Sequence, residues 1–94
     1  MKKSISKISV NNHISMWQSM TERNRHSECA MDIAKYFGYK ELWGAFKAIY
    51  NIHNQEGSLP YGVGRARYEL VGYMLCKIEE DYGVEMREKI SMCL

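Results

Sequence analysis

The chain has 94 residues, of which 46% are apolar and 26% charged, and its formal net charge is +2. This length suits one domain with one modest hydrophobic core, and the apolar content excludes an intrinsically disordered chain. A net charge so close to zero provides no global electrostatic field for binding nucleic acid.

The cysteines and the apolar runs indicate the compartment. Cys29, Cys76 and Cys93 are an odd number, are unevenly spaced and form no CxxC pair, which predicts free thiols in a reducing environment. No apolar run approaches the roughly 18 residues that span a bilayer. The basic start, MKKSISKISV, lacks the apolar core of a secretory signal. We therefore expect a cytoplasmic protein.

Residues 1–10 predict an N-terminal arm, because Ile8 and Val10 stand among serines and lysines with no clear strand partner elsewhere. We expect the two apolar residues to pack on the domain, while the lysines offer an alternative contact with a phosphate backbone. A single helical domain over residues 11–94 follows the arm.

Two apolar stripes follow the arm, and they fall on nearly opposite sides of any one continuous helix. Asn11 or Asn12 suits the N-cap of the first helix, which ends near Met20 or Thr21. The mismatch predicts a break within 21–27, with Ser27 as a possible second cap, and one bent helix remains the alternative. The first stripe comprises Ile14, Trp17 and Met20, and the second His26, Cys29, Ala30, Ile33, Ala34 and Phe37.

The next two elements are separated by glycine signals. Gly38 suits the residue after a helix end, with Tyr39 folding back on that helix. A third helix over Lys40–Asn54 presents one apolar face, which should pack against residues 70–78. Residues 55–64 contain the only proline and three glycines, so they predict a long loop. The apolar face holds Leu42, Ala45, Phe46, Ile49 and His53.

A long amphipathic helix begins at Arg65 in this interpretation and stops before Gly83. A short last helix over Val84–Cys93 places Met86 and Ile90 inward. The fold class is therefore all-α, a small bundle of four or five short helices with an extended N-terminal arm.

The charges of the long helix oppose its dipole, because Arg65 and Arg67 fall in its predicted first turn and Glu79, Glu80 and Asp81 in its last. Backbone N–H groups at a helix start, together with two guanidiniums, form an anion site. The alternative is structural: Arg65 pairs with Glu69 one turn later, and Arg67 lays its stem over the edge of the core.

Residues that could carry chemistry do not converge. His26 and Cys29 have the spacing of two zinc ligands, but no second pair completes a metal site. A Cys–His nucleophile would need an orienting group and an oxyanion hole, and the sequence shows neither. Three consecutive acids, 79–81, fan around a helix instead of converging. We expect no enzymatic activity, no metal and no cofactor.

We expect a small protein-binding module, because tyrosine and arginine are favoured at interfaces. In size and composition the chain resembles small accessory proteins of phages and mobile elements that bind and block a host protein. The alternative is a nucleic-acid or nucleotide binder that uses Arg65 and Arg67. Homo-oligomers are possible through the opposite charges of 1–25 and 78–94. The predicted binding residues are Tyr61, Arg65, Arg67, Tyr68, Glu79, Glu80 and Asp81.

Overall fold

The computed structural model describes residues 7–19, 25–57 and 60–94, without the side chains of residues 7, 8, 25 and 26. Helices make up the regular structure of this described part, which contains no strand, as the all-α prediction requires. None of the described helices is long and apolar enough to cross a membrane. The elements are α1 (Lys7–Gln18), the π-helical turn η1 (Arg25–Cys29), α2 (Ala30–Phe37), α3 (Lys40–Glu56), α4 (Tyr61–Tyr82) and α5 (Val84–Ser91).

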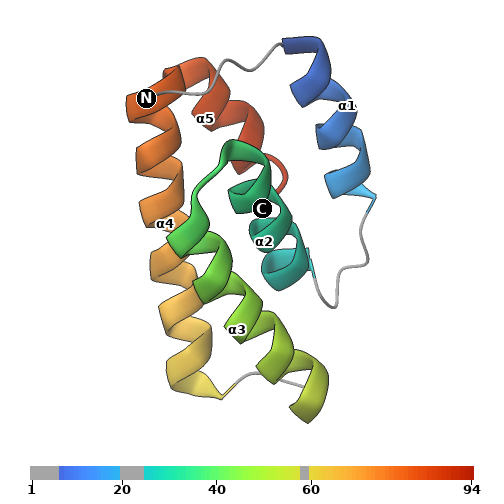
Figure 1. Cartoon of the computed structure of the whole chain (residues 1–94), viewed down its shortest axis with the longest axis vertical. Helices are drawn as coiled ribbons and strands as arrows, with labels where there is room; N and C mark the ends of the chain where they lie inside the picture. The colour runs from blue at the N-terminus through green and yellow to red at the C-terminus, as the bar shows by residue number, and fades with distance from the viewer. Residues whose placement is uncertain (1–6, 20–24, 58–59) are drawn as a thin grey trace.

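Helix α2 occupies the middle of the bundle, with α4 on one side of it and α1 on the other (Figure 1). Helices α3 and α5 both pack against α4, along different parts of its length (Figure 1). The buried positions of α2 recur at three- and four-residue spacing, so the predicted apolar face is confirmed. The buried apolar residues of the described part are Val10, Trp17, Cys29, Ala30, Ile33, Ala34, Phe37, Leu42, Phe46, Ile49, Met74, Ile78, Ile90 and Cys93, and Ser27 and His53 are buried as well.

Helix α1 begins at Lys7, earlier than a cap at Asn11 or Asn12 allows. Residues 7–10 of the predicted arm are therefore helical, while residues 1–6 lie outside the described part. The stripe explains the difference, because Val10 continues the spacing of the predicted face by one turn upstream. Val10 is fully buried, as predicted, whereas the side chain of Ile8 lies outside the description.

Two helices, not one bent helix, follow the arm, because α1 ends at Gln18 and η1 begins at Arg25. Residues 20–24, which include Met20 of the predicted face and most of the predicted break, lie outside the described part, as does the side chain of His26. Ser27 is not a cap. It lies inside the helical turn, and its hydroxyl accepts a hydrogen bond from Arg67 of α4.

The turn between α2 and α3 is a Schellman motif. Gly38 adopts a φ of 81°, and the N–H of Tyr39 donates to the carbonyl of Ala34 at 2.9 Å. The N–H of Gly38 donates to the carbonyl of Lys35 at 3.1 Å. Tyr39 folds back so that its ring stacks on Phe37 with centroids 6.2 Å apart. The predicted end of this helix is confirmed.

The predicted long loop over residues 55–64 is wrong. Helix α3 continues to Glu56, and α4 already begins at Tyr61, directly after Pro60. Gly62 and Gly64 therefore lie inside the helix. Glycine lowers helix propensity by about 1 kcal/mol but permits helical angles, so a helix already propagating from Arg65 can extend through it.

The last helix, α5, is shorter than predicted, since it ends at Ser91. Its inward residues are confirmed: Ile90 is fully buried, and Met86 packs on the core. Beyond the helix end, Cys93 is buried and Leu94 also packs on the core.

Helix α1 docks on α2 through aromatic side chains. The ring of Tyr36 contacts both His13 and Trp17, with centroids 4.3 Å and 5.7 Å away. The indole N–H of Trp17 donates to Asp32 at 3.1 Å, and the hydroxyls of Ser9 and Tyr36 lie 2.7 Å apart. Trp17 is fully buried, so it contributes a large apolar area to this contact.

Replacing Trp17 by alanine should lower the free energy of unfolding by about 3–5 kcal/mol, the usual cost of deleting a buried aromatic ring. Urea denaturation followed by far-UV circular dichroism measures this change. The matched control is Met16→Ala, one residue away and 43% exposed, which should cost less than about 0.5 kcal/mol. If both variants lowered the free energy of unfolding by the same small amount, the docking of α1 through Trp17 would be contradicted.

Candidate functional site on helix α4

Arg65 and Arg67 do not lie in the first turn of α4, so their predicted place at the helix N-terminus is wrong. The first turn is formed by residues 61–64, and the N–H of Gly64 donates to the carbonyl of Pro60 at 3.0 Å. The backbone N–H groups without an intrahelical acceptor are those of residues 61–63. The guanidiniums therefore belong to the second turn. The acids of residues 79–81 do lie in the last turn, as predicted.

Arg65 points into solvent and is weakly paired. Its Nε lies 3.9 Å from Oε1 of Glu69, and the two side chains are 71% and 74% exposed. This is the structural alternative that the spacing predicts. An ion pair so exposed contributes little to stability, so the guanidinium stays available for another carboxylate.

Arg67 lies on the inner side of the same helix. Its Nη1 donates to the hydroxyl of Ser27 at 3.2 Å, which joins α4 to η1. Partial burial lowers the pKa of the Arg67 guanidinium, but arginine still keeps its charge at neutral pH. The two arginines thus differ, since Arg65 faces outward and Arg67 holds two elements together.

Tyr61 and Tyr68 are the most exposed of the large apolar side chains in the described part, at 85% and 80%. Together with both arginines they line an open hollow of about 560 Å³ near the start of α4. A second hollow, of about 290 Å³, shares Arg67 and Tyr68 with the first and continues over Gly72. Its far wall is formed by Leu75, Ser91 and Leu94. Four predicted binding residues are thus brought together.

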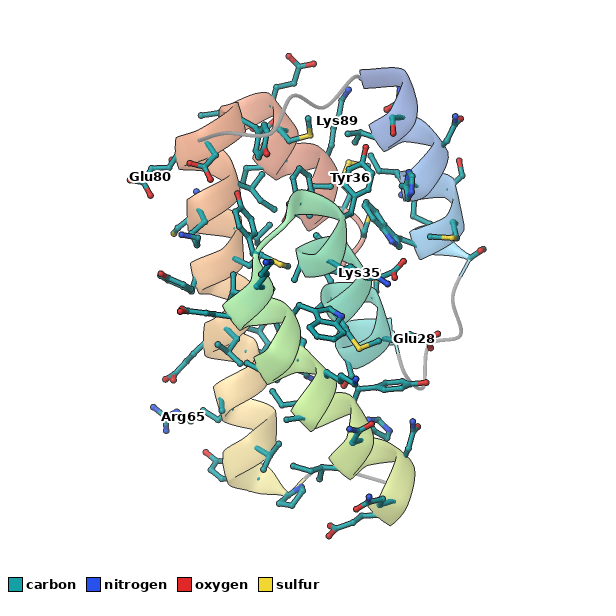
Figure 2. All side chains as sticks on the ribbon, in the orientation of Figure 1. Glu28, Lys35, Tyr36, Arg65, Glu80 and Lys89 are labelled. Carbon is teal, nitrogen blue, oxygen red and sulfur yellow. The ribbon has the colours of Figure 1, made fainter. Side chains whose placement is uncertain are left out.

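The acidic end of α4 is partly engaged within the fold. Glu79 accepts a hydrogen bond from Arg87 at 2.8 Å, and Asp81 accepts one from the Tyr39 hydroxyl at 2.9 Å. Glu80 is exposed, and Figure 2 shows it pointing away from the bundle on the same side of α4 as Arg65. The three acids therefore do not form one free patch.

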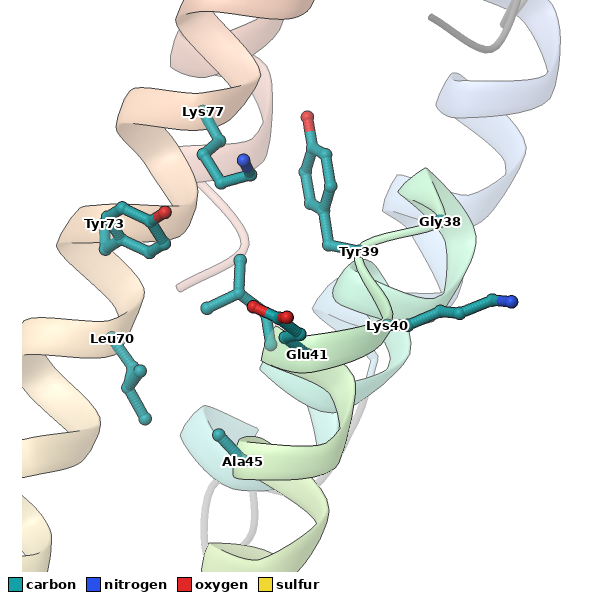
Figure 3. A pocket seen from close by; sticks show the side chains of 9 residues that line it. Gly38, Tyr39, Lys40, Glu41, Ala45, Leu70, Tyr73 and Lys77 are labelled. Carbon is teal, nitrogen blue, oxygen red and sulfur yellow. The ribbon is translucent and has the colours of Figure 1, made fainter. Parts of the chain in front are cut away.

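A hollow of about 440 Å³ between α3 and α4 lies outside the predicted site. Figure 3 shows Leu70, Tyr73 and Lys77 of α4 facing Tyr39 across it, while Lys40 points away. The ammonium of Lys77 lies 5.4 Å from the ring centroid of Tyr39 and 5.7 Å from that of Tyr73. The four-residue spacing of Tyr73 and Lys77 on one helix was the only signal available for this contact.

The possible metal ligands and the cysteines form no metal site in the part of the chain that the structure describes. No group of three or more potential ligands among His, Cys, Asp and Glu comes together there. The three cysteines form no disulfide, and Cys29 and Cys93 are buried while Cys76 is exposed. The thiol of Cys29 lies 3.7 Å from the carbonyl oxygen of Cys93, so the end of η1 contacts the segment that follows α5.

Comparison with protein-family models, curated proteins and solved structures finds no match for this chain. Its function therefore has to be inferred from the geometry of its surface.

Tyr39 should make stability depend on alkaline pH. Burial, followed by the hydrogen bond to Asp81, raises the pKa of the Tyr39 hydroxyl above the ordinary value for tyrosine. Below about pH 10 both folded and unfolded chains keep this proton, so the contribution is complete; it is lost as the pH rises through the folded pKa. We expect the free energy of unfolding to fall above about pH 10.

The variant Tyr39→Phe should show a flatter decline than the wild-type protein, as measured by urea denaturation between about pH 9 and 11.5. The control Tyr61→Phe changes a solvent-exposed ring and should leave the slope of the wild-type protein unchanged. Identical slopes for Tyr39→Phe and the wild-type protein would contradict the coupling of Tyr39 to Asp81.

Proposed function

We propose that this chain is a small non-enzymatic protein-binding module of the inhibitor or adaptor type, which binds its partner through the outer face of α4. This outer face consists of Tyr61, Arg65, Tyr68, Gly72, Leu75 and Glu79, which recur at alternating steps of four and three residues. The first four are exposed, and Leu75 and Glu79 are half-buried where the face borders α5. The observation that carries the proposal is the exposure of the Tyr61 and Tyr68 rings beside two hollows that have Arg67 and Tyr68 in common.

The physical reason is the cost of leaving these rings in water. Tyrosine buries a large apolar area at a low cost in side-chain entropy, and its hydroxyl can still find a polar partner. The described part of the chain covers neither the ring of Tyr61 nor that of Tyr68. Burial against a partner would therefore release free energy that folding alone has not used. The outward guanidinium of Arg65 lies between them and adds a site for a partner carboxylate.

A nucleic-acid or nucleotide ligand is the second candidate, because Arg65 and Arg67 border the same hollow as the two rings. Bases could stack on Tyr61 or Tyr68 while the arginines hold phosphate. Two contacts favour the first candidate over this one. The Arg67 guanidinium is directed to Ser27, and the carboxylate of Glu69 stands beside Arg65 and would repel phosphate.

A photo-crosslinking amino acid placed at Tyr61 or Tyr68 should form an adduct with a protein in cells of the native host. The matched control is the same amino acid at Tyr73, an exposed tyrosine of the same helix that borders the hollow on the α3 side. For the captured protein, Tyr68→Ala should weaken binding by roughly 2 kcal/mol, the loss expected for a central interface aromatic.

Three results would count against this surface or this class of partner. Equal adducts from the Tyr73 control, or none from Tyr61 and Tyr68, would contradict the choice of face. Adducts that disappear after nuclease treatment, and binding that weakens steeply with salt, would establish the nucleic-acid alternative. In that case, the double variant Arg65→Ala/Arg67→Ala should lose the nucleic acid, and retention of full binding would exclude it.

A further inference from the structure

The outer face of α4 has a spacing that reads the same in both directions. Its six residues follow one another at steps of four, three, four, three and four. Such steps keep residues on one stripe of a helix and are those of a helix-packing seam. When two copies of the stripe are laid antiparallel, Tyr61 meets Glu79, Arg65 meets Leu75, and Tyr68 meets Gly72.

The sizes of the facing residues are complementary. A methyl group added at Gly72 would meet no atom within 4 Å, so nothing within the described chain requires glycine there. Glycine in a helix interior nevertheless destabilises the helix relative to alanine. The hollow over Gly72, flanked by Tyr68 and Leu75, has a volume of about 290 Å³. The exposed ring of Tyr68 from a second copy is aligned with this hollow.

The charges of the two ends are complementary as well. Helical side chains lean toward the N-terminus of their own helix, so Arg65 leans toward Glu79 of an antiparallel copy, and that Glu79 leans back. Glu79 is 41% exposed, and a carboxylate that accepts one hydrogen bond from Arg87 has further acceptor sites. A two-fold axis repeats this pairing at both ends of the seam.

We propose that the outer face of α4 binds the same face of a second copy of this chain, antiparallel, with each Tyr68 ring in the hollow over the other Gly72. This inference rests on the proposed function and names the partner of that site. The pairing of Arg65 with Glu79 between copies fixes the orientation, since a parallel arrangement would place like charges together.

Charge reversal in both partners tests this arrangement. Arg65→Glu and Glu79→Arg should each weaken self-association roughly tenfold or more, because both seam ends then carry like charges. A mixture of the two variants should associate as strongly as the wild-type protein, since every pair in the mixed dimer is attractive again. Analytical ultracentrifugation measures the dissociation constants, and circular dichroism checks that each variant folds. The control Lys47→Glu makes the same change of charge on α3 and should leave association unchanged.

The substitution Gly72→Ala gives a second readout that a folding defect cannot imitate. It should raise the melting temperature of the monomer by roughly 3–6 °C, because it removes the entropy cost of glycine at an open position. It should also weaken the dimer severalfold, because the added methyl group occupies the hollow. A variant that is both more stable and less associated supports the proposal, and unchanged association overturns it.

The remaining outcomes separate this inference from the proposed function. Wild-type protein that stays monomeric up to about 1 mM overturns self-association, since weaker contacts are not specific. If Tyr68 then still forms adducts with a different protein, the proposed function stands without this partner. If neither dimer nor adduct is found, both fail. A wild-type dimer that the mixed variants do not restore overturns this interface.

Discussion

Helix α4 packs against two other helices of the chain, α3 and α5, and the rest of the structure depends on this constraint. Helix α3 packs along one part of it and α5 along another, so α4 must be longer than either (Figure 1). Its buried residues, Met74 and Ile78, lie on the side that faces these helices. On the outer face, Tyr61 and Tyr68 stay exposed. Farther along the helix this face borders α5, where Leu75 packs on the core and Glu79 accepts a hydrogen bond from Arg87. A helix that packed against only one other helix could have been shorter and would expose less surface.

Arg65 and Arg67 of α4 have different roles, one in solvent and one in packing. They are two residues apart, so they project to opposite sides of α4. Arg67 gives up part of its hydration to bond Ser27, and this fixes the start of the helical segment that leads into α2. Arg65 remains hydrated and weakly paired. The inner arginine therefore supports the surface that the outer one presents.

Elements with strong local signals could be predicted from the sequence. The apolar spacing of α2 and α3, together with Gly38, specified where these helices lie and which faces they bury. The start of α4 could not be predicted, because Gly62 and Gly64 read as loop residues, and only packing decides whether a helix extends through them. The contact between Ser27 and Arg67 joins residues 40 positions apart, and no periodicity reports such a distance in sequence. The hollow over Gly72 was equally hidden, since Ser91 at the end of α5 and Leu94 beyond it complete the wall.

The buried thiols of Cys29 and Cys93 allow the opening of the bundle to be followed by chemical modification. The thiol of Cys29 lies beside the backbone of Cys93, so the C-terminal segment packs against the end of η1. Cys76 is exposed and would react with an alkylating reagent in the native state. Cys29 and Cys93 are fully buried, so each would react only when the packing around it opens. The rate at which they are alkylated therefore measures how often the bundle opens, and no cysteine has to be introduced for the experiment.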